Sequence, residues 1–374
     1  MRLPTLAAFA VAASLAVATV APAAAGIVKY GPGAGHASVR IPAMVYRQAA
    51  GLAKAPVTQG AMQRLLSIIT THARPNLKAN PHAIVGLWVS DLGSDYLLGQ
   101  TAKGIHNVTA VDALANNCFF PIGIKVDHHR NLWVACQYNY STFANGMVQE
   151  YSSAGGLLNT YNDEIGCPSC SFAGYPSDVA WDAGGDVFAA NSDDSLGTGT
   201  VSWWPATGGN PTSITDPNLS SVSFMDTDSS GNLYVDGSAY SGGYEVDEIS
   251  TPTTNPTVTV LIPGGTISFA GGVYVSTHRG VQTLNVTDEI ARTITGYPLP
   301  FSPTFNRLLG PTVTNVSGSG EPVSGGFNMA NTSQADGDAS GWLDVGKVAS
   351  NTYRGVTSID FLAPEGAAYS PSDK

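Results

Sequence analysis

A hairpin-like stretch recurs along this chain and constrains its fold more than any other feature. Residues 121–135 read P-I-G-I-K-V-D-H-H-R-N-L-W-V-A: an alternating apolar segment, a polar turn, and a second apolar segment with an aromatic at its centre. This combination is typical of a β-hairpin. Similar stretches follow downstream, so we expect one structural unit to be repeated along the chain.

The central aromatic of the second segment recurs at intervals that fit a repeat architecture. The separations are 45, 55, 46 and 40 residues, and the aromatics are Trp88, Trp133, Phe188, Tyr234 and Tyr274. One four-stranded propeller blade takes about forty residues. Stacking such blades in a ring buries both apolar faces of each sheet, so the spacing predicts a β-propeller.

The last part of the repeat pattern is less regular. The best candidate for a sixth aromatic is Trp342, which follows Tyr274 after 68 residues. Residues 355–360 resemble the first strand of a repeat, and we expect them to complete the first repeat, which lacks such a strand before Leu87. The expected fold is an all-β, six-bladed β-propeller of four-stranded antiparallel blades over residues 81–374, with seven blades as the alternative.

Composition agrees with many short strands and limits the partners. Charged residues make up 12% of the chain and glycine contributes 42 of 374 residues, which favours strands and tight turns over helices. The net charge of −11 argues against nucleic acid or an anionic membrane surface as a partner. We expect a monomer that meets an unknown small polar ligand, glycan or protein.

The N-terminal region differs from the repeats. Residues 1–25 combine an early arginine, an alanine-rich apolar run and small residues at the end, which is typical of a signal peptide. A buried helix or membrane anchor fits less well because the run is short and ends in a cleavage-like site. We therefore expect a secreted or periplasmic protein without a membrane span, and an N-terminal arm over residues 26–80 with one short helix at 59–73.

Four cysteines in an exported chain suggest two disulfides. Cys118 precedes the first strand of the hairpin and Cys136 follows the second, so antiparallel pairing brings both to the same end. We predict the pairs Cys118–Cys136 and Cys167–Cys170. A thioredoxin-like redox pair is the alternative for Cys167 and Cys170, but no βαβ pattern surrounds them.

The repeated element resembles a known group of propellers. The stretches P-I-G-I-K-V-D-H-H-R-N-L-W-V-A, P-S-D-V-A-W-D-A-G-G-D-V-F-A-A-N and D-S-S-G-N-L-Y-V-D-G resemble NHL-type repeats, which are similar to gluconolactonase-like and virginiamycin B lyase-like propellers. The resemblance covers roughly residues 84 to 361. It implies the fold but no particular activity, because these motifs form the hairpin framework that such propellers share.

Propeller ligands usually bind at one end of the central channel, beside the loops that enter each innermost strand and leave the second strand. This mapping predicts a rim of polar and aromatic residues that suits a small polar or sugar-like ligand. The candidate ligand-binding residues are Asn116, Asn117, Phe120, Gln137, Asn139, Tyr175, Asn191, Asp193 and Asp236. A solvated rim without a specific ligand is the competing interpretation.

A divalent cation in the channel is the alternative that the resemblance implies. Gluconolactonase-like enzymes hold the cation with Glu, Asn and Asp, yet no Glu begins an innermost strand in the second to fourth repeats. The lyase-like relatives use His and Glu around magnesium, but His128 and His129 lie in a turn at the opposite end. We predict no cofactor, with calcium or magnesium in the channel as the alternative.

Residues 226–232 resemble the start of a calcium loop. The twelfth loop position, which needs a bidentate Glu, would be Gly237. Asp, Ser, Gly and Asn also permit a tight turn, and this turn is the preferred interpretation.

Two functional hypotheses follow from the sequence. The first is an exported binding or interaction module with its channel mouth as the binding site, without catalytic residues. The second is a lactonase- or lyase-like enzyme that uses a divalent cation in the channel. A purely structural surface protein is a third, less favoured possibility. Carboxylate, Asn or His groups that converge in the channel would support the enzyme.

Overall fold

The structure is a computed structural model, and it describes most of the chain after residue 86. The described residues are 87–91, 95–100, 107–141, 146–163, 175–191, 198–268, 270–278, 280–288, 293–304, 307–309, 316–319, 328–334, 341–347, 352–356 and 364–369. The predicted signal peptide, the N-terminal arm with its helix, Asp193, Cys167 and Cys170 lie outside these residues. Among the described elements, no helix has the length and hydropathy to span a membrane.

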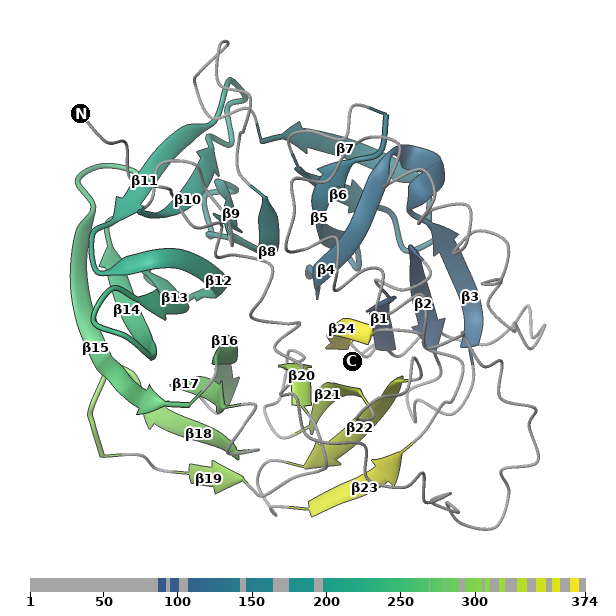
Figure 1. Cartoon of the computed structure of the whole chain (residues 1–374). Coiled ribbons are helices and arrows are strands. Elements are labelled where there is room, and N and C mark those ends of the chain that lie inside the picture. The colour runs from purple at the N-terminus through teal and green to yellow at the C-terminus, as the bar shows by residue number, and fades with distance from the viewer. Residues whose placement is uncertain are drawn as a thin grey trace, which may run out of the picture.

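The described strands form antiparallel four-stranded sheets arranged in a ring (Figure 1). The first sheet, in the order β24-β1-β2-β3, joins the first and the last of the described strands. Its strands are β1 (Leu87–Asp91), β2 (Tyr96–Gln100), β3 (Asn107–Asp112) and β24 (Pro364–Tyr369). The second sheet contains β4 (Cys118–Val126), β5 (Leu132–Asn139), β6 (Met147–Tyr151) and β7 (Leu157–Asn162).

The third and fourth sheets continue the ring. The third contains β8 (Pro176–Trp181), β9 (Val187–Asn191), β10 (Gly199–Trp204) and β11 (Thr212–Asp216). The fourth contains β12 (Leu219–Thr227), β13 (Leu233–Ala239), β14 (Tyr244–Ser250) and β15 (Thr257–Ile267). In both sheets the aromatic that defines the repeat lies on the second strand, as predicted.

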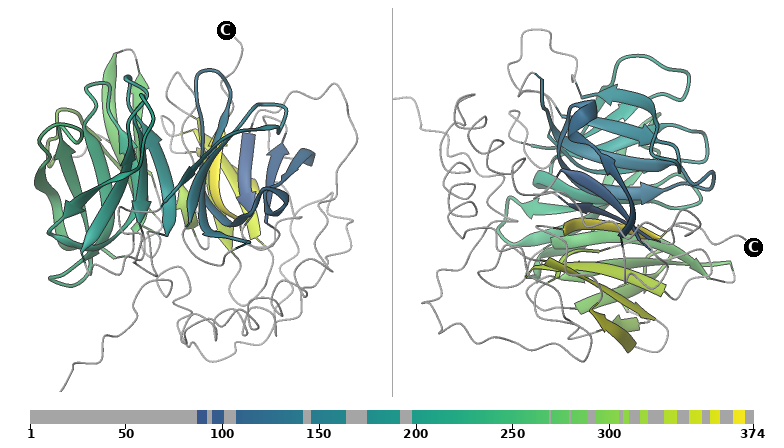
Figure 2. Two further views of the ribbon diagram at one scale, coloured as in Figure 1. Left: turned by 90° about the horizontal axis from the view of Figure 1, so that it is seen from above. Right: turned by 90° about the vertical axis from the view of Figure 1, so that its right-hand side faces the viewer.

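The remaining sheets are formed by the C-terminal part of the chain. The fifth contains β16 (Ala270–His278), β17 (Val281–Asp288), β18 (Thr293–Pro298) and β19 (Arg307–Leu309). A further sheet contains β20 (Val316–Ser319), β21 (Asn328–Gln334), β22 (Gly341–Lys347) and β23 (Thr352–Val356). The edge-on views show the sheets standing side by side around the ring (Figure 2).

The prediction of six equivalent four-stranded blades with a helical arm needs correction. Side chains are described in five blades of three or four strands, whereas β19 and β20–β23 are described as backbone strands only. Tyr274 lies on the innermost strand β16 and Trp342 on the third strand β22, so neither occupies the second-strand position that its repeat predicts. The only described helical element is the 3-10 turn η1 (Leu114–Asn116).

The closing strand also differs from the prediction. The strand that pairs with β1 is β24, with Trp88 opposite Ala368, and not residues 355–360. Part of that predicted segment belongs instead to β23. Apolar alternation has the same period in every strand of a sheet, so it cannot by itself say which strand closes the ring.

Apolar side chains are buried between neighbouring sheets, which explains why one sheet alone would not fold. One core joins the first and second sheets and includes Trp88, Ile124, Tyr151 and Ala368. Other cores lie between the second and third, the third and fourth, and the fourth and fifth sheets. Burial of this apolar surface supplies the main driving force for ring formation.

The innermost strands carry β-bulges near their starts, where the pairing with the second strand of the same sheet shifts in register. Register shifts occur between Pro121 and Ile124 in β4, Pro176 and Asp178 in β8, and Val222 and Phe224 in β12. Similar shifts occur in β16 and β20. A bulge bends its strand and changes the direction of the side chains that follow.

Candidate functional site: the aromatic rim of the second blade

The candidate site lies where β4 begins and β5 ends. The chain enters β4 through η1, and Asn117 ends this turn with a left-handed φ of 64°. Asparagine is one of the few residues that adopt this conformation readily. The amide N–H of Cys118 donates to the carbonyl of Ala113 at 3.0 Å, which fixes the start of the strand.

A disulfide holds the two strands together at this end. Cys118 and Cys136 are bonded, with Cα atoms 5.1 Å apart, which confirms the predicted pair. Both sulfurs are buried. In the strand register, Cys118 lies opposite Asn139 and Pro121 lies opposite Cys136, so the disulfide joins diagonal positions of the hairpin, next to the register shift between Pro121 and Ile124. The disulfide therefore fixes the backbone under the rim.

Five aromatic rings gather here, and we call them the aromatic rim: Phe119, Phe120, Tyr138, Tyr140 and Tyr175. Phe119 is fully buried and forms the floor, whereas the other four rings are partly exposed. Phe119 stacks on Phe120 with ring centroids 4.0 Å apart. Tyr138 lies 6.0 Å from Phe120 and 4.9 Å from Tyr175, so the rim joins the second and third blades.

Phe120 is held in an unusual backbone conformation. Its φ is 55°, in the left-handed region that a bulky residue rarely adopts. Its amide N–H donates to Oδ1 of Asp95 in the first blade at 3.0 Å. Asp95 is buried, and burial raises the pKa of its carboxyl well above the usual range. Such a conformation persists only where surrounding contacts maintain it, and such residues cluster at binding sites.

Amide groups surround the rings. Asn117 is exposed and Asn116 and Asn139 are partly exposed. The carbonyl of Asn116 accepts a hydrogen bond from Nε2 of Gln149 at 2.8 Å, and Oδ1 of Asn139 accepts one from Oγ of Ser141 at 2.7 Å. An amide side chain both donates and accepts hydrogen bonds, so it complements a neutral polar ligand.

Part of this arrangement is framework and recurs in the fourth blade. The amide N–H of Tyr140 donates to the carbonyl of Asn117 at 2.8 Å, and that of Tyr240 donates to the carbonyl of Asn218 at 3.3 Å. The same loop contact thus exists twice. Among the described residues, however, only the second blade adds the stacked phenylalanines and the tyrosine pair to this framework.

The structure brings together some of the predicted site residues and separates others. Asn116, Asn117, Phe120, Asn139 and Tyr175 lie at the rim. Three other candidates are interior: Gln137, Asn191 and Asp236 are 3%, 0% and 0% exposed.

The interior candidates take part in hydrogen bonds within and between strands. Nδ2 of Asn191 donates to Oγ of Ser202 at 3.0 Å. Oδ1 of Asp236 accepts from the amide of Phe224 at 2.9 Å, which belongs to the bulged strand β12. All three residues lie on second strands, Gln137 on β5, Asn191 on β9 and Asp236 on β13, and their side chains are buried between strands. Their role in ligand binding stays a prediction.

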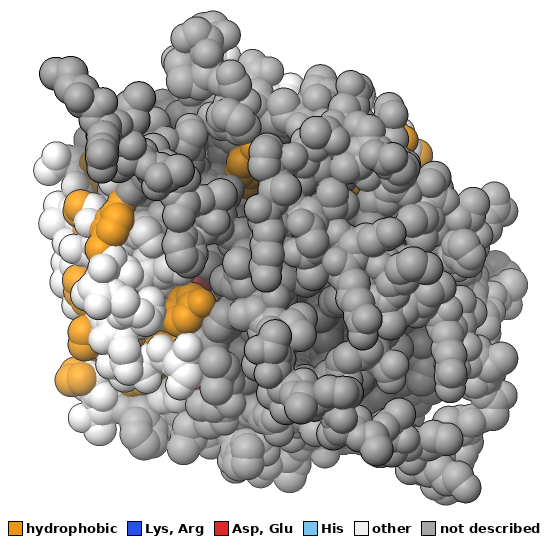
Figure 3. All heavy atoms as spheres, viewed as in Figure 1, with side chains coloured by type: hydrophobic (Ala, Val, Ile, Leu, Met, Phe, Trp, Pro, Cys, Tyr) orange, Lys and Arg blue, Asp and Glu red, His pale blue; other side chains and the backbone are white. Residues whose placement is uncertain are grey.

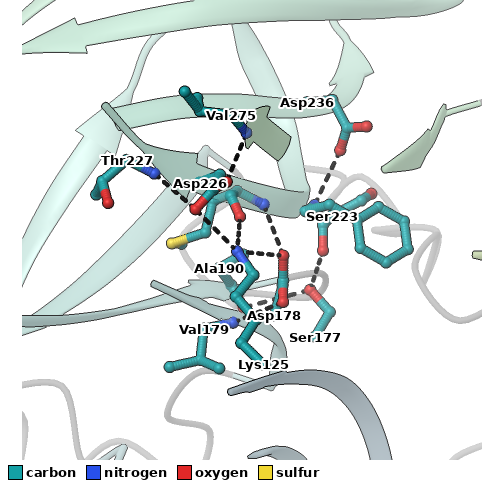
Figure 4. Close-up of polar contacts among 12 residues, drawn as sticks. Lys125, Ser177, Asp178, Val179, Ala190, Ser223, Asp226, Thr227, Asp236 and Val275 are labelled. Carbon is teal, nitrogen blue, oxygen red and sulfur yellow. Dashed lines mark hydrogen bonds and ion pairs between the residues drawn. The ribbon is translucent and has the colours of Figure 1, made fainter. Parts of the chain in front are cut away.

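A buried ion-pair cluster that sequence reasoning missed joins the innermost strands of three blades (Figure 4). Lys125 on β4 is 4% exposed, and its Nζ lies 3.6 Å from Oδ2 of Asp178 and 3.4 Å from Oδ1 of Asp226. Nζ also donates to the carbonyl of Met225. The signal in the sequence was a charged residue within each of three first strands: Lys125 and Asp226 lie opposite the repeat aromatic, and Asp178 lies two residues earlier than that position in its strand.

The two carboxylates also bind the backbone of the next blade. Asp178 on β8 accepts from the amide of Met225 on β12 at 3.0 Å. Asp226 on β12 accepts from the amide of Val275 on β16 at 2.6 Å. Burial raises the pKa of Asp178, and the ammonium of Lys125 opposes this effect. The cluster therefore connects the innermost strands of four consecutive blades, and its groups are already paired with protein atoms.

Further buried carboxyls lie between blades. Asp163 accepts a hydrogen bond from Oγ of Ser202, and burial raises the pKa of Asp163 to about 7. Asp216 and Asp247 are neighbours across the third and fourth blades, and Nδ2 of Asn218 donates to Oδ2 of Asp247 at 3.4 Å. Two buried carboxyl groups this close repel each other when both are ionised, so one of them holds a proton more tightly. Burial, with Asp216 and Glu245 nearby, raises the pKa of Asp247 to about 8.

The described residues contain no group of three or more His, Cys, Asp or Glu side chains arranged to hold a metal ion. Asp228, in the stretch that resembles a calcium loop, accepts hydrogen bonds from the amides of Ser230 and Asn232 at 2.8 and 2.9 Å. His129 similarly donates its amide N–H to Asp127 in the turn between β4 and β5. Both stretches thus form tight turns.

The described surface shows no single apolar patch on the face viewed in Figure 3, where hydrophobic side chains lie in separate small groups. Large exposed hydrophobic residues are also scattered over several strands and loops: Leu157, Leu158, Tyr240, Val260 and Val281. Isolated residues of this kind are common on protein surfaces. The aromatic rim differs from them because its rings are in mutual contact.

Fold and site together define a β-propeller with an aromatic rim at one blade junction. No protein-family model matches the sequence, and no curated protein does. Among solved structures, TolB from Acinetobacter baumannii is similar to this chain with a TM-score of 0.52 and 10% identity over 87% of this chain and 73% of that protein. At this identity the similarity shows the fold alone.

Two further solved structures are more distant. Hydrazine synthase from Kuenenia stuttgartiensis has a TM-score of 0.47 and 11% identity over 73% of this chain and 80% of that chain. The calcium-binding protein regucalcin from Agrobacterium tumefaciens has a TM-score of 0.47 and 13% identity over 66% of this chain and 77% of that chain.

Proposed function

We propose that this chain is an exported β-propeller that works as a binding module, with its ligand on the aromatic rim. Export is supported by the signal-like residues 1–25 and by the buried Cys118–Cys136 disulfide, since disulfides persist in oxidising compartments. The repeat motifs support membership of the NHL-type and gluconolactonase-like group of propellers as part of the same proposal.

The observation that carries this proposal is the cluster of partly exposed rings fixed from below. A disulfide, the buried ring of Phe119 and the hydrogen bond from Phe120 to Asp95 hold the rim in place. Rigid aromatic side chains give large contact area at low entropic cost, and preorganised sites bind more tightly. A small polar ligand, a glycan or a protein would use the same surface.

The enzyme hypothesis has less support from the described residues. Its requirement is a set of ligand side chains that converge in the channel on a divalent cation. The described part of the channel instead places Lys125 between Asp178 and Asp226. No specific observation therefore favours lactonase or lyase chemistry.

The proposal is tested by whether ligands bind through Tyr138. We would label the mature chain with 3-fluorotyrosine, assign the resonances by single Tyr→Phe variants, and screen neutral sugars, nucleosides and short peptides by ¹⁹F NMR. Saturable shifts of the Tyr138 and Tyr175 signals are the expected result. If no compound shifts the Tyr138 and Tyr175 signals, the rim is not the binding site, whether or not a compound binds elsewhere on the protein.

A further inference from the structure

We propose that the aromatic rim recognises a neutral pyranose ring; this inference rests on the proposed function and names its ligand class. The argument uses the shape of the ring cluster, the amides beside it and the charges around it. A pyranose has an apolar face of C–H groups and an equatorial belt of hydroxyls. A complementary site therefore needs aromatic rings below and neutral hydrogen-bonding groups at the side.

The rings meet the first requirement. Phe120, Tyr138 and Tyr175 are partly exposed and follow one another in contact, at 6.0 and 4.9 Å between centroids. Their planes are inclined by 75° and 53°, so they form a faceted surface and not one flat plate. Such a surface can support more than one face of a non-planar ring. The stacked Phe119 keeps Phe120 from moving inward.

The amides meet the second requirement. Asn117 is exposed at the left-handed end of η1, and Asn139 lies opposite Cys118 in the strand register. Asn117 comes two residues before Phe119 in the chain, and Asn139 directly follows Tyr138, so both are next to the rings. Hydroxyl groups donate and accept hydrogen bonds, and amide side chains do the same.

Charge argues for a neutral ligand. The described residues around the rim, 112–121, 136–141 and 175–178, contain no Lys or Arg, and Lys125, the next cation along β4, is paired with Asp178 and Asp226. The charged group nearest η1 in the chain is Asp112, which is exposed and caps the amide of Ala115 at 3.0 Å. The whole chain carries a net charge of −11. An anionic sugar would thus meet negative charge without a basic partner among the described rim residues.

The experiment uses the same fluorotyrosine-labelled chain with defined probes. Cellotetraose and chitotetraose are the neutral pyranose probes, tetragalacturonate is the anionic one, and sorbitol offers hydroxyls without a ring. We expect saturable shifts of the Tyr138 and Tyr175 signals with at least one neutral tetrasaccharide. We expect at least about tenfold weaker binding of tetragalacturonate and no saturable shift with sorbitol.

Matched variants connect the binding to the rim. Tyr138→Ala is expected to weaken binding at least about tenfold, whereas Tyr138→Phe, which keeps the ring, should retain most of it. Tyr240→Ala is the control, because Tyr240 occupies the equivalent loop of the fourth blade. Thermal melts of each variant show whether it is folded. Should Tyr138→Ala fail to fold, Tyr175→Ala replaces it.

Different failures have different meanings. Equal binding of tetragalacturonate overturns the neutral-ligand inference, and equal binding of sorbitol overturns recognition of the ring. Shifts caused by peptides or nucleosides but by neither sugar overturn the sugar inference and leave the proposed function standing. Sugar binding that is unchanged by both Tyr138→Ala and Tyr175→Ala overturns both proposals.

Discussion

At the scale of single residues, the protein combines a low overall charge density with several fully buried carboxyls. Asp95, Asp163, Asp236 and Asp247 are each 0% exposed, and burial raises the pKa of every one of them. The values for Asp163, Asp236 and Asp247 are about 7, 8 and 8. Their protonation therefore affects stability within the physiological pH range.

The pH dependence has a definite sign. A carboxyl whose pKa is higher in the folded state binds its proton more tightly there, so its stabilising contribution is complete below the unfolded pKa near 4. This contribution is lost as the pH rises through the folded pKa. We therefore expect the free energy of unfolding to fall as the pH rises from about 4 to about 8. Above that pH these groups should not change the free energy of unfolding further.

Asp247→Asn tests the carboxyl pair directly. An amide donates a hydrogen bond to Asp216 at every pH and carries no charge, so the variant should gain about 1–3 kcal/mol over the unsubstituted protein at pH 8 and less at pH 5. Urea unfolding at both pH values measures this difference. Asp112→Asn, at an exposed carboxyl, is the control. A gain that is equal at pH 5 and pH 8 would contradict the shared-proton interpretation.

At the scale of elements, the innermost strands are joined by charge and not only by apolar contact. Lys125 on β4 forms ion pairs with Asp178 on β8 and Asp226 on β12. Each carboxylate also accepts a hydrogen bond from a backbone amide in the innermost strand of the next blade. Gly123, on the same strand as Lys125, permits this close approach. A Cβ at position 123 would lie 2.6 Å from the Cα of Asp178. Strand β4 is therefore fitted closely against β8.

Lys125→Met is the corresponding prediction. Removing the ammonium leaves two buried carboxylates without their counter-charge, which typically costs about 3–5 kcal/mol. The free energy of unfolding from a urea titration measures the loss. Adding Asp178→Asn and Asp226→Asn to Lys125→Met removes the uncompensated charge and should recover part of the stability. A loss below about 1 kcal/mol in the single variant would show that the cluster contributes little.

At the scale of the whole molecule, the ring depends on a strand from the far end of the chain. β24 is the innermost strand of the first sheet, pairs with β1, and carries Ala368 into the core between the first two blades. The backbone hydrogen bonds between β24 and β1 therefore join the last described strand to the first blade and close the ring. Closure protects sheet edges and apolar faces from solvent.

Deleting residues 364–374 removes this closing strand. We expect the truncated chain to lose its single cooperative melting transition or to become insoluble, because the first blade then lacks its innermost strand. Deleting only residues 370–374 is the control and should leave the melting temperature unchanged, since β24 ends at Tyr369. Calorimetry of both chains makes the comparison. A cooperative transition at the original temperature after the longer deletion would refute closure by β24.

The sequence by itself determined the all-β class, the positions of the repeat aromatics through Tyr234 and the Cys118–Cys136 disulfide, while the ligand-binding role of the predicted rim residues stays a prediction. The class, the aromatic positions and the disulfide depend on alternation, turn residues and antiparallel pairing, which act over short stretches. The tertiary structure alone decided which strand closes the first blade, where Tyr274 lies, and which residues surround Lys125. Such features depend on contacts between blades and on bulges. Alternation with a period of two residues is the same in neighbouring strands, so it does not predict which blade each side chain will contact.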